Sequence, residues 1–95
     1  MIKIIGKTPD NKSVIKGLFH IYETEGIPLD LILQSTKDND LVPCWISFYL
    51  EAKSSGMSHD RIINKLEPAI IDSFGLFWAS QVIDTLNNLY NQRKL

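Results

Sequence analysis

The sequence predicts an all-α domain, a small bundle of four to five short helices around a central apolar helix at about residues 43–55, with a short extended N-terminal arm. Apolar side chains recur at helical spacing over most of the chain, and glycine and proline stand where such helices would begin and end. The 95 residues are 44% hydrophobic and 22% charged, with a net charge of −1. This composition fits a single domain spanning residues 1–95 and argues against a disordered chain.

The N-terminal arm is predicted from residues 2–5, which read Ile-Lys-Ile-Ile and end at Gly6. Such a run is typical of a short β-strand. No later segment resembles a strand that could pair with it, and a lone strand leaves its backbone groups unpaired. We therefore expect an extended arm that lies on the helices or pairs with another molecule.

A first helix is expected from Thr8-Pro9-Asp10 to Gly26. Threonine can cap a helix, proline suits the first helical position, and aspartate favours the positive end of the helix dipole. The apolar residues that follow recur at helical spacing: Val14, Ile15, Leu18, Phe19, Ile21 and Tyr22. Gly17 would then lie inside the helix at a cost of about 1 kcal/mol relative to alanine.

The second and third helices are predicted from prolines at their first turns. Pro28 opens a helix that ends in the polar residues 38–40, and Pro43 opens the next, which Gly56 stops. Apolar residues cover almost the whole circumference of the segment 43–55. A helix that is apolar all round is a buried one, so this segment is predicted to be the central helix.

Ser58 is expected to cap a fourth helix, whose apolar stripe continues in phase towards the C-terminus. Pro68 lies inside this stripe and predicts a kink or a restart. Gly75 predicts a bend, followed by a C-terminal helix that reaches about Tyr90. The pattern leaves open whether residues 68–90 form one bent helix or two.

Charge and cysteine content exclude several classes of function. Ten basic and eleven acidic residues provide no bulk field for nucleic acid or an anionic membrane. Residues 1–7 lack the apolar stretch of a signal peptide, and the near-apolar run 41–50 is about half the length of a membrane span. The single cysteine, Cys44, cannot form an internal disulfide, so we expect a cytoplasmic protein without a membrane partner.

The chain offers little that could support catalysis or bind a cofactor. Structural zinc needs about four cysteine or histidine ligands, and the candidates Cys44, His20 and His59 lie far apart in the sequence. Cys44 is the one plausible nucleophile, but its apolar helix indicates a structural residue of the core. We therefore expect no enzyme activity, no catalytic residues, no metal and no cofactor.

Residues 51–66 resemble a helix-turn-helix motif. The motif has a small residue in its first helix, glycine in the turn, an apolar residue after it and apolar positions in the second helix. The matching residues are Ala52, Gly56, Met57 and Ile62. Glu51, Ser55 and Lys65 depart from it, because the motif is normally apolar at these positions.

The resemblance implies a DNA-binding regulator as an alternative function. Lys53 would lie near phosphate, and four side chains would face the major groove: His59, Arg61, Asn64 and Lys65. The other interpretation is an ordinary helical hairpin, in which Gly56 ends one helix and Ser58 caps the next. The net charge of −1 favours the hairpin, because nonspecific DNA affinity comes mainly from phosphate neutralisation.

The run Leu76-Phe77-Trp78 is the strongest candidate for a partner-binding site. Three successive helical residues point in three directions, so they cannot all face one small core, and one or more should be exposed. The phase of the stripe places Phe74, Trp78 and Val82 inward, with Phe77 at an edge and Leu76 further round. An exposed apolar cluster beside a bend is typical of a binding surface, although a crowded fold could bury all three.

These observations favour a noncatalytic, cytoplasmic helical protein that acts by protein–protein interaction. It would bind another protein or itself, as an adaptor, an inhibitor or a homodimer. The abundance of Ile, Asn and Lys is favoured by AT-rich coding and hints at an accessory protein of a bacterium, a phage or a mobile element.

Overall fold

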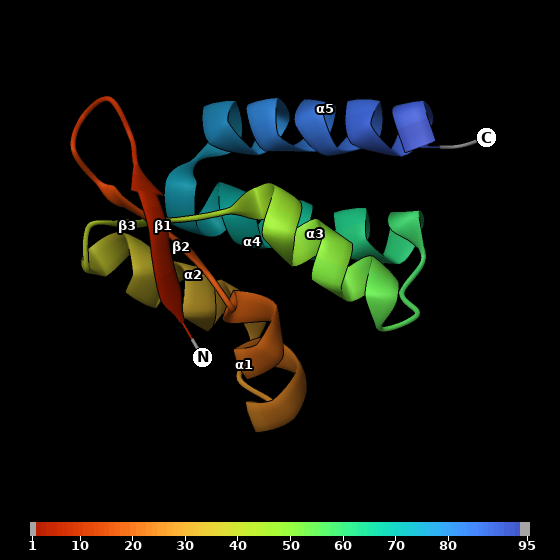
Figure 1. The fold of residues 1–95 in the computed structure, drawn as a ribbon, viewed down its shortest axis with the longest axis horizontal. Helices are drawn as coiled ribbons and strands as arrows, with labels where there is room; N and C mark the ends of the chain where they lie inside the picture. Colours follow the sequence, from red (N-terminus) through yellow and green to blue (C-terminus); the bar gives the residue numbers. More distant parts are fainter. Residues whose placement is uncertain (1, 94–95) are drawn as a thin grey trace.

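The computed structural model describes residues 2–93 and combines five helices with a three-stranded sheet (Figure 1). The elements in chain order are β1 (Lys3–Lys7), β2 (Ser13–Lys16), α1 (Leu18–Glu25), α2 (Leu29–Asp38), β3 (Leu41–Pro43), α3 (Trp45–Ser54), α4 (His59–Phe74) and α5 (Leu76–Arg93). The fold is mostly helical, at 67% of the chain, as the sequence predicts. The expectation of an all-α fold is wrong in one respect, because it omits the sheet.

The sheet has the order β1-β2-β3. The sequence pattern did not predict that these three segments pair with one another. β1 and β2 form an antiparallel hairpin, with Lys3 opposite Lys16 and Ile4 opposite Ile15. The register shifts between Ile4 and Gly6, which marks a β-bulge. β2 also pairs in parallel with β3. The predicted N-terminal arm is therefore a strand that pairs within its own chain.

The helix predicted from Thr8 to Gly26 is wrong in its first half. Residues 8–12 form the hairpin loop: the Thr8 backbone N–H donates to the Lys12 carbonyl at 2.8 Å, and the Lys12 N–H donates to Thr8 Oγ1 at 3.0 Å. Asn11 adopts a left-handed conformation with φ 68°. Thr, Asp and Asn favour tight turns through the same kind of local hydrogen bond that favours helix starts, and Pro favours both through its fixed φ.

Helix α1 begins only after Gly17, which has φ 103° and precedes the first helical residue. The β-branched pair Val14-Ile15 lies in β2 instead of a helix, in keeping with the strand preference of such side chains. Gly17 thus occupies a left-handed junction between strand and helix, where glycine is favoured. The predicted end at Gly26 is confirmed, since this residue caps α1 with φ 67°.

The central helix is α4, and the prediction that residues 43–55 fill this role is wrong. α4 packs against α2 on one side and α5 on the other, and it also contacts α3. In α3, which begins at Trp45, Ile46 is 43% exposed. One buried cluster spans the helices and β2, and its fully or almost fully buried members include Ile15, Leu33, Tyr49, Ala52, Ile62, Leu66, Ile70 and Leu86.

The junction of α4 and α5 settles how the C-terminal half is divided. α4 continues through Pro68 to Phe74 without the expected restart, and Gly75 separates it from α5 with φ 98° and ψ 165°. The bend predicted at Gly75 is confirmed, and the region forms two helices that lie against each other (Figure 1). Ser58 caps α4 as predicted, since its hydroxyl accepts a hydrogen bond from the Arg61 N–H at 3.3 Å.

Candidate functional site

The first turn of α5 presents the largest exposed apolar side chains of the described residues. Leu76 is 71% exposed, Phe77 70% and Trp78 53%. The rings of Phe77 and Trp78 contact each other edge to face, with centroids 6.2 Å apart. We refer to Leu76, Phe77 and Trp78 as the α5 cluster.

The inward position predicted for Trp78 is wrong, although Val82 is buried as expected. The prediction assumed that the apolar stripe of α4 continues in phase beyond Gly75. The conformation of Gly75 instead ends α4, and α5 begins on a new axis. Within α5 the buried residues are Ala79, Val82, Ile83 and Leu86. Leu76 lies three residues before Ala79, and Trp78 lies four residues before Val82. Both therefore flank the N-terminal end of the buried stripe. Phe77 lies on the opposite side of the helix, so the prediction that Phe77 lies at the edge of the stripe and Leu76 further round is also wrong.

An apolar groove of about 440 Å³ adjoins the α5 cluster. It lies between the β1–β2 loop and the α4–α5 junction. Its lining residues are Thr8, Pro9, Asp10, Lys12, Val42, Trp45, Phe74 and Trp78. Trp45 and Phe74 pack edge to face with centroids 5.8 Å apart, and Trp78 belongs to both the groove and the α5 cluster. An apolar hollow with a few polar groups at its rim is the usual form of a binding site.

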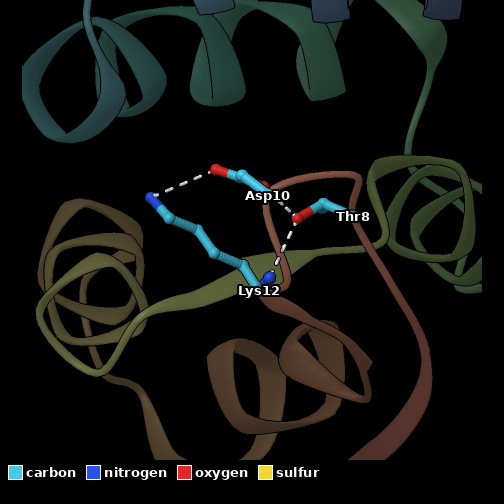
Figure 2. A network of polar contacts seen from close by, with 3 residues as sticks. All are labelled: Thr8, Asp10 and Lys12. Carbon is cyan, nitrogen blue, oxygen red and sulfur yellow. Dashed lines mark hydrogen bonds and ion pairs between the residues drawn. The ribbon is translucent and has the colours of Figure 1, made fainter.

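The hairpin loop forms the polar rim of the groove, and polar contacts join three of its side chains (Figure 2). The Thr8 hydroxyl donates to the Asp10 carboxylate, and Lys12 Nζ lies 4.0 Å from the other oxygen of that carboxylate. The hydrogen bond from Thr8, with a smaller contribution from Lys12, lowers the pKa of Asp10 below its ordinary value. The rim therefore presents one anionic and one cationic group at neutral pH.

The five residues proposed for DNA binding do not form one free surface. Both ring nitrogens of His59 are engaged, Nδ1 with the Tyr49 hydroxyl at 2.8 Å and Nε2 with Asn87 Oδ1 at 2.8 Å. The His59 ring also stacks on Tyr90, with centroids 4.1 Å apart. Lys53 Nζ lies 5.6 Å from the centroid of the same Tyr90 ring. His59 thus joins α3, α4 and α5.

The three remaining candidates of that motif are exposed on α4: Arg61, Asn64 and Lys65. A short turn after Ser54 connects α3 to α4, which both the helix-turn-helix resemblance and an ordinary helical hairpin imply. Asp60 and Glu67 are exposed on the same helix, so its outer surface carries both signs of charge.

Cys44 has a structural position between the sheet and α3. It is the residue before Trp45, its backbone N–H donates to the Ile15 carbonyl at 2.7 Å, and Ser47 Oγ donates to its sulfur at 3.1 Å. The side chain is half-buried, where the sequence suggested a core position. No group of three potential metal ligands occurs within residues 2–93.

The groove could not be found from the sequence, because its hairpin rim was assigned to a helix. The turn signal Thr8-Pro9-Asp10-Asn11 followed by a β-branched pair was the clue available.

No protein-family model, curated protein or solved structure matches the chain. Among the described helices, none combines the length and apolar character needed to cross a membrane.

Proposed function

We propose that this protein is a noncatalytic, cytoplasmic adaptor or inhibitor that binds another protein through the α5 cluster and the adjoining groove. The observation that carries the proposal is the exposure of three consecutive large apolar residues, Leu76, Phe77 and Trp78, beside an apolar groove. Single exposed apolar residues are normal on a protein surface, whereas a contiguous group of this size is typical of a binding site.

The size of the surface is compatible with a specific interface. Covering the exposed parts of the α5 cluster buries roughly 400 Å² of this protein, about half of the area that each partner contributes to a standard interface. The groove and its rim supply further area. Trp and Phe side chains at the centre of an interface often dominate its binding energy.

The form of the surface indicates what the partner presents. The groove walls formed by Trp45, Phe74 and Trp78 suit an apolar side chain. Phe77 contacts Trp78 but does not line the groove, and its exposed ring projects outward to fit a hollow on the partner. Asp10 and Lys12 at the rim suit polar or charged groups around that side chain. We therefore propose a folded protein partner with an apolar anchor surrounded by polar residues. The composition, rich in Ile, Asn and Lys, supports the separate proposal that the chain is an accessory protein of a bacterium, a phage or a mobile element.

Site-specific photo-cross-linking in the source cells tests this proposal. A photoreactive phenylalanine analogue is placed at position 77 and, as the matched control, at position 31. Leu31 is also an exposed apolar residue, 58% exposed, but it lies on α2. The proposal predicts a discrete cross-linked product with a second protein from position 77 only, and its loss when Trp78→Ala is added. Equal products from both positions, a product containing only a second copy of this chain, or no product would overturn it.

A further inference from the structure

The outer edge of β1 is a second surface, and it pairs with no other strand among residues 2–93. β1 is the first strand of the order β1-β2-β3, so only one of its edges is paired. All five residues of β1 are exposed, and the apolar side chains Ile4 and Ile5 are 67% and 48% exposed. An edge strand presents a row of backbone N–H and C=O groups that can pair with another extended segment.

We infer that this edge binds an extended peptide segment in which acidic and apolar residues alternate, as an added strand of the sheet. The inference concerns residues other than the α5 cluster and does not depend on the function proposed for that cluster. Strand addition gains affinity from backbone hydrogen bonds and specificity from alternate side chains.

The register of the sheet specifies the apolar positions of the added strand. Ile4 lies opposite Ile15, and Ile15 lies opposite Pro43, so these three side chains form one row across the sheet. Ile15 and Pro43 are buried, whereas Ile4 is the exposed end of the row. An apolar residue placed beside Ile4 would extend the row and cover that side chain.

The neighbouring row specifies the acidic positions. Lys3 lies opposite Lys16, and like charges directly across a strand pair are unfavourable. Both lysines line a depression of about 430 Å³ with His20 and Glu51, but Glu51 forms no ion pair with either of them. A carboxylate placed beside Lys3 would relieve this repulsion. Because successive residues of a strand point to opposite faces, an acid beside Lys3 and an apolar residue beside Ile4 give an alternating pattern.

Charge also argues against a second copy of the chain as the occupant. The hairpin, residues 3–16, carries four lysines and one aspartate, Asp10, which already contacts Lys12. Two β1 strands side by side would bring together four lysines and no carboxylate. Lysines and a bulge on an edge strand discourage pairing with a second copy of that strand. An acidic strand is instead attracted by the lysines of β1. The exposed isoleucines favour a peptide over a nucleic acid, which would leave them uncovered.

The test uses a labelled peptide of about eight residues of alternating valine and glutamate, enough to span a strand. Its affinity is measured by fluorescence anisotropy, and its site by amide chemical shifts. Matched probes are an alternating valine–lysine peptide, a polyglutamate peptide and a short single-stranded oligonucleotide. We expect the valine–glutamate peptide to bind most tightly, with shifts centred on residues 2–7 and an affinity that falls as salt is added.

Charge reversal at the edge provides the decisive comparison. Lys3→Glu should weaken the valine–glutamate peptide about fivefold or more and strengthen the valine–lysine peptide. Lys37→Glu, an exposed lysine on α2, should change neither affinity by more than about twofold. Unchanged shifts of the core amides show that both variants fold. Equal binding of all probes, tighter binding of polyglutamate or the oligonucleotide, shifts centred on residues 76–78, or no binding would overturn the inference.

Discussion

Replacing Gly75 by alanine tests the junction that sets the direction of α5. Gly75 has φ 98° and ψ 165°, a region that only glycine occupies readily. A Cβ at this position would meet no atom within 4 Å, so the whole effect comes from the backbone. Forcing an L-residue into such a conformation costs roughly 1–3 kcal/mol. The lower entropy of the unfolded alanine chain offsets about 0.4–1 kcal/mol of this.

The expected net loss for Gly75→Ala is therefore about 1–2 kcal/mol, which lowers Tm by roughly 5–15 °C in a domain of this size. Thermal and urea unfolding followed by circular dichroism measure both quantities. Gly6→Ala is the matched control, because a Cβ there also meets no atom within 4 Å and its φ is not positive. The reasoning is refuted if the two variants unfold at the same temperature.

Three further substitutions or deletions test other contacts. Burial, and to a lesser extent the nearby Tyr90, raises the pKa of Tyr49 above its ordinary value of 10.0. The protonated Tyr49 hydroxyl therefore contributes fully to the free energy of unfolding below pH 10, and this contribution is lost as the pH rises through the folded-state pKa. In Tyr49→Phe, the free energy of unfolding should therefore fall less steeply with pH above pH 10. At pH 7 the substitution should cost on the order of 1 kcal/mol, because it removes the hydrogen bond to His59. An unchanged dependence of stability on alkaline pH contradicts this. Cys44→Ala should lower the free energy of unfolding by on the order of 1 kcal/mol and leave partner binding intact; rapid thiol labelling with parallel loss of binding would show a reactive cysteine instead. Deleting residues 1–6 should lower Tm, since it removes most of β1 and its pairing with β2; an unchanged melting curve would mean that the hairpin adds nothing to stability.

The helical part of the fold was largely predictable because its signals are local. The Ser58 cap, the stop at Gly26 and the break at Gly75 follow from the conformations that these residue types prefer. The sheet was not predictable in the same way, because its pairing joins residues far apart in sequence. β3 has three residues and includes Pro43, which reads as a helix start until its partner β2 is known.

The α5 cluster could be predicted from a local pattern, whereas the groove depends on contacts between residues far apart in the sequence. The run Leu76-Phe77-Trp78 predicts that one or more of its side chains are exposed, and all three are, including Trp78, which was predicted to point inward. The groove needs the hairpin loop, Trp45 and the α4–α5 junction to meet, which no local pattern encodes. The engagement of His59 with Tyr49 and Asn87 was equally hidden, since Asn87 lies 28 residues further along the chain.

The affinity of the partner captured through position 77 for the Phe77→Ala variant tests the central claim most directly. Phe77 is 70% exposed, so this substitution should leave Tm almost unchanged, and Leu31→Ala serves as the control of equal character on α2. Titration calorimetry should show binding weakened about tenfold or more for Phe77→Ala, since removing a central aromatic residue commonly costs about 2 kcal/mol. Leu31→Ala should bind normally. Normal binding by Phe77→Ala, together with DNA binding that Arg61→Ala abolishes in a gel-shift assay, would contradict the account and support the helix-turn-helix hypothesis.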